Sequence, residues 1–179
     1  MEEKLTSCIT KKNTNYIPIW FMRQAGRYLP EFREIRKKNK NFINLCLNPE
    51  LVTEITLQPI DRFDLDAAII FSDILMIPYG LGQDVRFEKD FGPILGICNL
   101  DKIIKTDAID FIQKMIPVYK AIKETKKKLN NKNLIGFVGA PWTLLLYMLN
   151  RKSPKNNFDI DLILKDKFLV NRLLKKLEE

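Results

Sequence analysis

The chain has 179 residues, with 30 lysine and arginine side chains against 22 aspartate and glutamate side chains, and therefore a net charge of +8. Hydrophobic residues make up 46% of the sequence, which is enough for a packed core and argues against global disorder. The chain contains no histidine, which excludes from it the Ser-His-Asp triad, the HExxH metalloprotease motif and every histidine-ligated metal site.

The cysteines and glycines exclude further kinds of site. Cys8, Cys46 and Cys98 form no CxxC pair, so we expect no zinc knuckle and no redox pair, and free thiols in a reducing cytoplasm. The seven glycines form neither GxGxxG nor a Walker A motif, the two commonest phosphate-binding loops. Every apolar run is far shorter than the ~20 residues that span a membrane, so no membrane anchor is expected.

The excess of positive charge lies largely in three clusters, Arg36–Lys40, Lys123–Lys128 and Lys175–Lys176. A nucleic-acid interface would interleave such charges with aromatic side chains or place them on a recognition helix. The clusters contain no aromatic residue, and we therefore interpret them as solvated helix faces and expect no nucleic-acid partner.

The predicted elements alternate between helices and strands. The polar residues 1–16 predict a flexible N-terminal arm, and an Asn-Pro-Glu start at Asn48 predicts a capped helix that ends near Arg62. The nearly continuous apolar run 65–71 is typical of a parallel strand buried on both faces. The other predicted elements are an extended segment at 17–20, helices at 30–40, 107–129 (broken in two at Pro117), 143–150, 159–164 and 166–179, a hairpin near 85–87 and a strand at 134–138.

Strands that alternate with helices predict a parallel α/β fold. Only about three core strands can be found, and the last predicted helix stops at Glu179 without a glycine or proline stop signal. We therefore expect the chain to be one part of a larger domain.

The segment from Met22 to Pro30 carries the clearest chemistry. Arg23 and Arg27 lie four residues apart around Gln-Ala-Gly, and a guanidinium matches a carboxylate with two parallel hydrogen bonds. Small residues between them would let a ligand approach the backbone N–H groups. From spacing alone, a carboxylate-binding loop and a pair of structural surface arginines remain equally open.

Two further side chains are candidates by position. Asp73 follows the predicted strand 65–71, where catalytic groups of α/β barrels are found, although it could equally cap the next turn or pair with Arg23. Tyr147 lies in the helix that follows the next strand, and its hydroxyl could meet a substrate carboxylate or serve packing alone.

Three runs resemble the signatures of the uroporphyrinogen decarboxylase family, in the right order: WFMRQAGRYLPEFR at 20–33, DLDAAIIFSDIL at 64–75 and GFVGAPWTL at 136–144. The resemblance extends from Ile17 to the end of the chain. It implies a (β/α)8 TIM barrel, of which residues 17–179 would be the N-terminal half behind the 1–16 arm. It also implies a homodimer in the cytoplasm that needs no cofactor and no metal.

The family removes the four acetate carboxyls of uroporphyrinogen III, giving coproporphyrinogen III in haem biosynthesis. The substrate-binding residues that the resemblance implies are Arg23, Gln24, Ala25, Gly26, Arg27, Arg36, Asp73 and Tyr147. Asp73, which would face the pyrrole N–H groups, and Arg23 are the expected catalytic residues.

Three alternatives stay open. The chain could be an inactive truncated remnant, or one half of a split enzyme that needs a complementary chain, because a half-barrel leaves strand edges unpaired. It could be a corrinoid-linked methyltransferase, which shares the barrel. A basic RNA-binding module is the remaining alternative.

Overall fold

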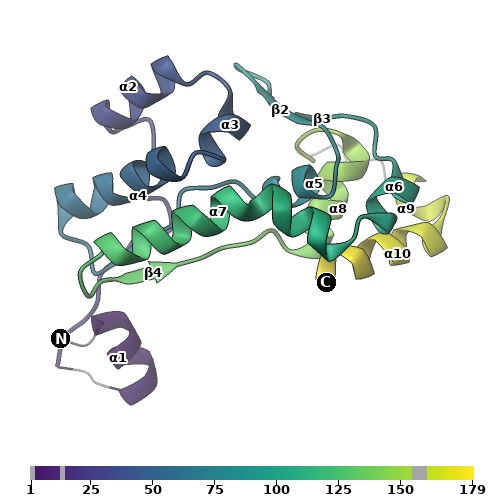
Figure 1. Ribbon diagram of the computed structural model, residues 1–179. Helices are drawn as coiled ribbons and strands as arrows, with labels where there is room; N and C mark the ends of the chain where they lie inside the picture. The colour runs from purple at the N-terminus through teal and green to yellow at the C-terminus, as the bar shows by residue number, and fades with distance from the viewer. Residues whose placement is uncertain (1–2, 13–14, 155–160) are drawn as a thin grey trace. The chain divides into compact units, whose positions relative to one another are not determined.

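The computed structural model describes residues 3–12, 15–154 and 161–179, and it divides the chain into two compact units (Figure 1). Unit 1 comprises residues 1–40, 44–72 and 116–137, and unit 2 comprises residues 41–43, 73–115 and 138–179. The chain passes between the units on both sides of residues 41–43, directly after Ser72, inside helix α7 (Ala108–Lys128) beside Pro117, and directly after Phe137.

Unit 1 is built on a parallel pair of strands, β1 (Ala67–Ile69) and β4 (Asn133–Ile135). Ala67 lies opposite Asn133, and the N–H of Ile70 extends the ladder by donating to the carbonyl of Ile135 at 3.1 Å. Helix α4 (Pro49–Phe63) and the part of α7 in this unit pack on the pair, with Val52, Ile70 and Ala121 buried between them. Helices α1 (Lys4–Lys11) and α2 (Pro30–Lys38) contact β4 and α4 respectively.

The sequence predicted the main elements of unit 1. Both strands are confirmed, in parallel and shorter than expected, and the Asn48 side chain caps α4 by accepting a hydrogen bond from the Leu51 N–H at 3.1 Å. Residues 4–11 of the predicted arm form α1, because the Asn133 side chain accepts from the backbone N–H groups of Leu5 and Thr6 and so caps a helix with no local cap.

The prediction of two helices around Pro117 is wrong. Helix α7 runs unbroken through this proline, as α4 runs through Pro59. Proline removes one N–H donor but keeps a helical φ, and the buried residues Met115 and Ala121 on either side hold both turns against the core.

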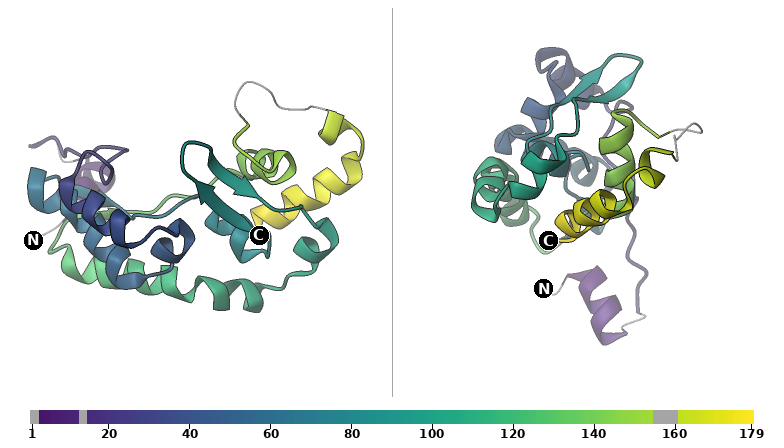
Figure 2. Two further views of the ribbon diagram at one scale, coloured as in Figure 1. Left: turned by 90° about the horizontal axis from the view of Figure 1, so that it is seen from above. Right: turned by 90° about the vertical axis from the view of Figure 1, so that its right-hand side faces the viewer.

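Unit 2 contains a hairpin and a group of short helices. The predicted hairpin is confirmed as β2 (Val85–Glu88) antiparallel to β3 (Gly92–Leu95). Helix α10 (Lys167–Glu178) buries Leu173 and packs along both α8 (Pro141–Asn150) and α6 (Leu100–Lys105), as Figure 2 shows. The remaining helices are α3 (Phe42–Cys46), which crosses the unit boundary, α5 (Met76–Gly80) and α9 (Asp161–Leu164).

The parallel strand pair with its covering helices makes this an α/β fold. The first two residues of the helix predicted at 159–164 lie outside the described residues. Among the helices that the structure describes, none has both the length and the apolar character of a membrane span.

Candidate functional site

The loop that carries Arg23 and Arg27 is fastened to β1 by Gln24. The Gln24 side chain is only 4% exposed, and its Nε2 donates to the Ala67 carbonyl at 2.7 Å. Its Oε1 accepts from the Ile69 N–H at 3.1 Å. Both polar ends of this predicted substrate-binding side chain therefore pair with the strand, which gives Gln24 a structural role that the sequence did not predict.

Further contacts by Tyr28, Arg33 and Leu29 brace the same loop. The Tyr28 hydroxyl donates to the Gln24 carbonyl, and the Tyr28 ring stacks on Phe63 with centroids 6.3 Å apart. The Arg33 guanidinium donates to the carbonyls of Arg27 and Tyr28 at 2.9 and 3.2 Å. The N–H of Leu29 closes a turn on the Gly26 carbonyl at 3.0 Å. The backbone of the loop is thus held in place without a ligand.

Arg33 was missed as a functional candidate at the sequence level, although it lies inside the first matching run. Its side chain reaches back five and six residues to the loop carbonyls, across the first turn of α2. Such spacing gives no separate sequence signal, because a basic residue in the first turns of a surface helix is common.

The guanidinium groups of Arg23 and Arg27 differ from that of Arg33 in their contacts. Both side chains are exposed, and neither forms an ion pair or a side-chain hydrogen bond within the described residues. Arg36 is half-buried and donates to the carbonyls of Asn39 and Lys40. Burial lowers the pKa of the Arg36 guanidinium, and the positive charge of Arg27 lowers it further. Unit 1 therefore gathers positive charge at Arg27 and Arg36, which suits an anionic ligand.

Ala25 and Gly26 are half-buried within the loop. A Cβ on Gly26 would meet the Tyr28 ring at 3.6 Å, an ordinary van der Waals distance. The fold alone therefore does not require glycine at position 26. The predicted approach of a ligand to the backbone at Gly26 stays a prediction.

Asp73 begins unit 2 and caps the turn that follows it. Its Oδ1 accepts from the Leu75 N–H at 2.8 Å, and its backbone carbonyl accepts from the Met76 N–H at 3.1 Å. Burial raises the pKa of the Asp73 carboxyl, and the Leu75 N–H offsets this only in part. The capping role that the sequence left open for Asp73 is therefore present.

The third matching run packs through a glycine. A Cβ on Gly139 would lie 2.6 Å from a Leu144 methyl carbon and 3.1 Å from Ile74 Cβ, so only glycine fits here. Tyr147 is half-buried in α8, and its hydroxyl lies 3.5 Å from the Ser153 Oγ, at the limit of a hydrogen bond. Tyr147 therefore has no strong partner that would define its role.

The structure brings the arginine loop and Arg36 together in unit 1, and it places Asp73 and Tyr147 in unit 2. The predicted approach of Asp73 to the arginines stays a prediction.

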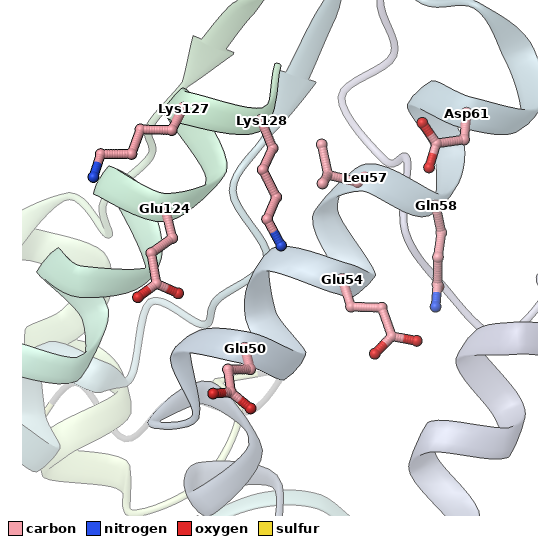
Figure 3. A pocket seen from close by; sticks show the side chains of 8 residues that line it. All are labelled: Glu50, Glu54, Leu57, Gln58, Asp61, Glu124, Lys127 and Lys128. Carbon is pink, nitrogen blue, oxygen red and sulfur yellow. The ribbon is translucent and has the colours of Figure 1, made fainter. Parts of the chain in front are cut away.

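A groove in unit 1 lies apart from all of these residues. It runs between α4 and α7 and is lined by charged side chains of both signs (Figure 3). Its lining residues are Glu50, Glu54, Leu57, Gln58, Asp61, Glu124, Lys127 and Lys128. The groove contains none of the candidate residues, and within the described residues no group of three or more acidic or cysteine side chains could hold a metal ion.

Comparisons with known proteins agree with the pattern of motifs. A family model described as "Uroporphyrinogen decarboxylase" matches residues 1–179. Curated proteins named uroporphyrinogen decarboxylase from Campylobacter jejuni subsp. jejuni serotype O:2 and Rickettsia felis are each 46% identical to this chain over 94% of its length, covering 51% and 49% of those relatives. The protein of that name from Chelativorans sp. is 48% identical over 83% of the chain and 44% of the relative.

A solved structure, a methyltransferase from Methanosarcina mazei, aligns with 97% of this chain and 50% of its own length, with a TM-score of 0.69 and 17% sequence identity. At that identity the likeness supports the α/β fold alone. The chain spans about half the length of the curated relatives it matches.

Proposed function

The chain belongs to the uroporphyrinogen decarboxylase family, and we propose that it binds uroporphyrinogen III and serves the removal of the four acetate carboxyls that gives coproporphyrinogen III. The activity is that of a carboxy-lyase in haem biosynthesis. It needs neither a cofactor nor a metal, because the substrate itself accepts the electrons of each bond that breaks.

One observation carries this proposal: a braced loop that presents two exposed guanidinium groups, neither of which has an ion-pair or side-chain hydrogen-bond partner in the described ranges. Gln24 joins this loop to Ala67 and Ile69, so Arg23 lies one residue from an anchor on β1. Asp73 comes four residues after Ile69, so the Cα atoms of these two residues are at most about 14 Å apart even if the chain between them is fully extended. An eight-carboxylate substrate suits fixed arginines, because a guanidinium on a rigid loop loses little freedom on binding a carboxylate.

In the proposed reaction, an ionised Asp73 accepts the pyrrole N–H groups at the centre of the macrocycle and holds it in one shape. Protonation of the pyrrole carbon beside an acetate arm makes a cationic ring, which Asp73 stabilises. The bond from the methylene carbon to the carboxylate then breaks, its electron pair enters the ring and carbon dioxide leaves. The methylene carbon takes up a proton to become methyl, and the ring carbon loses the proton that it had gained.

The other parts of the proposal concern architecture and assembly. We place residues 17–179 in the N-terminal half of a (β/α)8 barrel, with β1 and β4 as neighbouring barrel strands. The family resemblance supports a homodimer, which sedimentation velocity would test. Cys8, Cys46 and Cys98 form no disulfide with one another, which suits the reducing cytoplasm.

The test is conversion of uroporphyrinogen III to coproporphyrinogen III under anaerobic conditions. Three preparations are compared: this chain, a fusion in which residues 1–179 replace the matching half of the Campylobacter jejuni relative, and that relative itself. We expect the fusion to be active. A fully folded fusion without product, alongside an active relative, would contradict the proposed function. The chain alone, with and without the relative's other half, then shows whether it needs a complementary chain.

A further inference from the structure

The edge of β1 that faces away from β4 is occupied by a side chain instead of a strand. Along a strand, the backbone groups point alternately to one edge and the other. The Asp66 carbonyl and the Ile70 N–H pair with β4. The Ala67 carbonyl and the Ile69 N–H therefore face the opposite edge, and Gln24 pairs with both.

We propose that Gln24 is a positioning residue, whose amide locks the 23–27 loop onto the free edge of β1 and thereby fixes Arg23 and Arg27 for the carboxylates of the substrate. This inference rests on the proposed function for its ligand. It assigns Gln24 no contact with the substrate through its side chain, because both polar atoms of that side chain are already used.

Only a glutamine makes this contact at its full strength. The site needs a donor toward the Ala67 carbonyl and an acceptor toward the Ile69 N–H, about one peptide unit apart on the strand edge. An asparagine is one methylene shorter, an ionised glutamate lacks the donor, and a methionine of similar size lacks both. Because Gln24 is almost fully buried, losing its amide leaves two backbone groups of β1 without partners.

Arg23 depends on this contact more than the rest of the loop does. Arg23 adjoins Gln24, and its side chain has no contact of its own within the described residues that would hold it. The carbonyls of Arg27 and Tyr28 are held by Arg33 at the other end of the loop. Without the Gln24 contact, the nearest attachment of Arg23 to the strand would be four residues away, where the Ile19 backbone pairs with Asp66.

The first arm of the test needs no ligand. Trypsin cleaves after exposed arginines only where the backbone can open, so a locked loop protects the bonds after Arg23 and Arg27. We expect Gln24→Met to raise the rate of cleavage at these two bonds about tenfold or more relative to cleavage after the exposed Lys105 in unit 2. An unchanged ratio of these cleavage rates would show that Gln24 does not hold the 23–27 loop on β1.

The matched control is Gln58→Met. Gln58 is also a nearly buried glutamine of unit 1, but its amide has no hydrogen-bond partner within the described residues. The same replacement there removes no contact of the loop, and we expect neither the tryptic pattern at Arg23 and Arg27 nor ligand binding to change. Similar effects from both variants would mean that Gln24 acts only through general stability, and would overturn its positioning role.

The second arm measures the affinity for uroporphyrinogen III by anaerobic calorimetry, at a temperature where both variants are fully folded. We expect Gln24→Met to weaken binding about tenfold and Gln58→Met to leave it unchanged. If the wild-type chain binds and Gln24→Met binds equally well, the inference fails while the proposed function stands. If neither the wild-type chain nor the fusion with an unchanged Gln24 binds, the proposed function fails, and the tryptic arm still decides whether Gln24 locks the loop.

Discussion

The two ends of β1 carry carboxylates in opposite states. Before the strand, Asp66 accepts from Lys4 Nζ and from the Ile19 N–H, each at 2.8 Å. Burial alone would raise the pKa of Asp66, but these two donors outweigh it and leave the pKa below its usual value. Beyond the strand, Asp73 is half-buried with one backbone donor, Leu75, and burial raises its pKa.

The strand β4 repeats this contrast. At its start, the Asn133 amide binds Glu3 and Thr6 of the N-terminal segment, and Lys126 holds the pKa of Glu3 below its usual value. Beyond its end, Val138 is 70% exposed and Trp142 is 51% exposed. The beginnings of the two strands thus have their polar groups paired, which stabilises the fold, while the segments that follow them contain a carboxyl with a raised pKa and exposed large side chains.

The largest effect that follows from this contrast is on turnover. Asp73→Asn keeps an oxygen for the Leu75 N–H but removes the charge that would stabilise the cationic ring. We expect turnover of the active fusion to fall about 100-fold or more, with a much smaller change in affinity for uroporphyrinogen III. Unchanged turnover would remove Asp73 from the catalytic residues.

The largest effect on stability is expected at the start of β4. Asn133→Ala removes the cap of α1 and the contacts with Glu3 and Thr6, and we expect the free energy of unfolding to fall by about 2–3 kcal/mol. Urea denaturation measures this loss. Asn150→Ala is the control, because both hydrogen bonds of the Asn150 side chain are weak, with donor–acceptor distances of 3.5 Å. We expect this variant to change the free energy of unfolding by no more than about 0.5 kcal/mol.

Two glycines beyond the end of β4 provide a matched pair. A methyl group on Gly139 would overlap Leu144, so we expect Gly139→Ala to destabilise the fold by about 1–3 kcal/mol. A methyl group on Gly136 has open space, and we expect Gly136→Ala to be close to neutral. Equal thermal unfolding of the two variants would show that the 139–144 packing is not tight.

The smallest effect is expected at the start of β1. Folding lowers the pKa of Asp66, so the ionised carboxylate stabilises the folded state at pH values above the pKa that Asp66 has in the unfolded chain. This stabilisation is lost as the pH falls through the lower pKa that Asp66 has in the folded state. At pH 7 we expect Asp66→Asn to lower the free energy of unfolding by about 1–2 kcal/mol, since Lys4 is well exposed and screened by water. The two proteins should converge in acid.

The sequence predicts the helices and strands whose formation depends on residues close together in the chain. The proline and asparagine at the start of α4, the hairpin of β2 and β3 and the two apolar strands follow from short-range patterns. Helix α1 could not be predicted, because its cap, Asn133, lies more than 120 residues away. The continuity of α7 through Pro117 depends on packing along the whole helix.

Within the candidate site, too, the sequence predicts the roles of some residues and not of others. The arginines are visible in the sequence because a guanidinium has a specific chemistry at any position. The role of Gln24 is not visible, because it depends on which edge of β1 is free. The opposite pKa shifts of Asp66 and Asp73 likewise depend on donors that come from distant segments or are missing.

The contrast between the two ends of β1 is tested most directly by comparing the free energies of unfolding of the variants Asp73→Asn and Asp66→Asn. Since burial raises the pKa of Asp73, its charge opposes folding at neutral pH, and this penalty disappears as the pH falls below the unfolded pKa. Urea unfolding at pH 7 should therefore show Asp73→Asn to be more stable than the wild-type chain and Asp66→Asn to be less stable. A loss of stability in both variants would contradict the account.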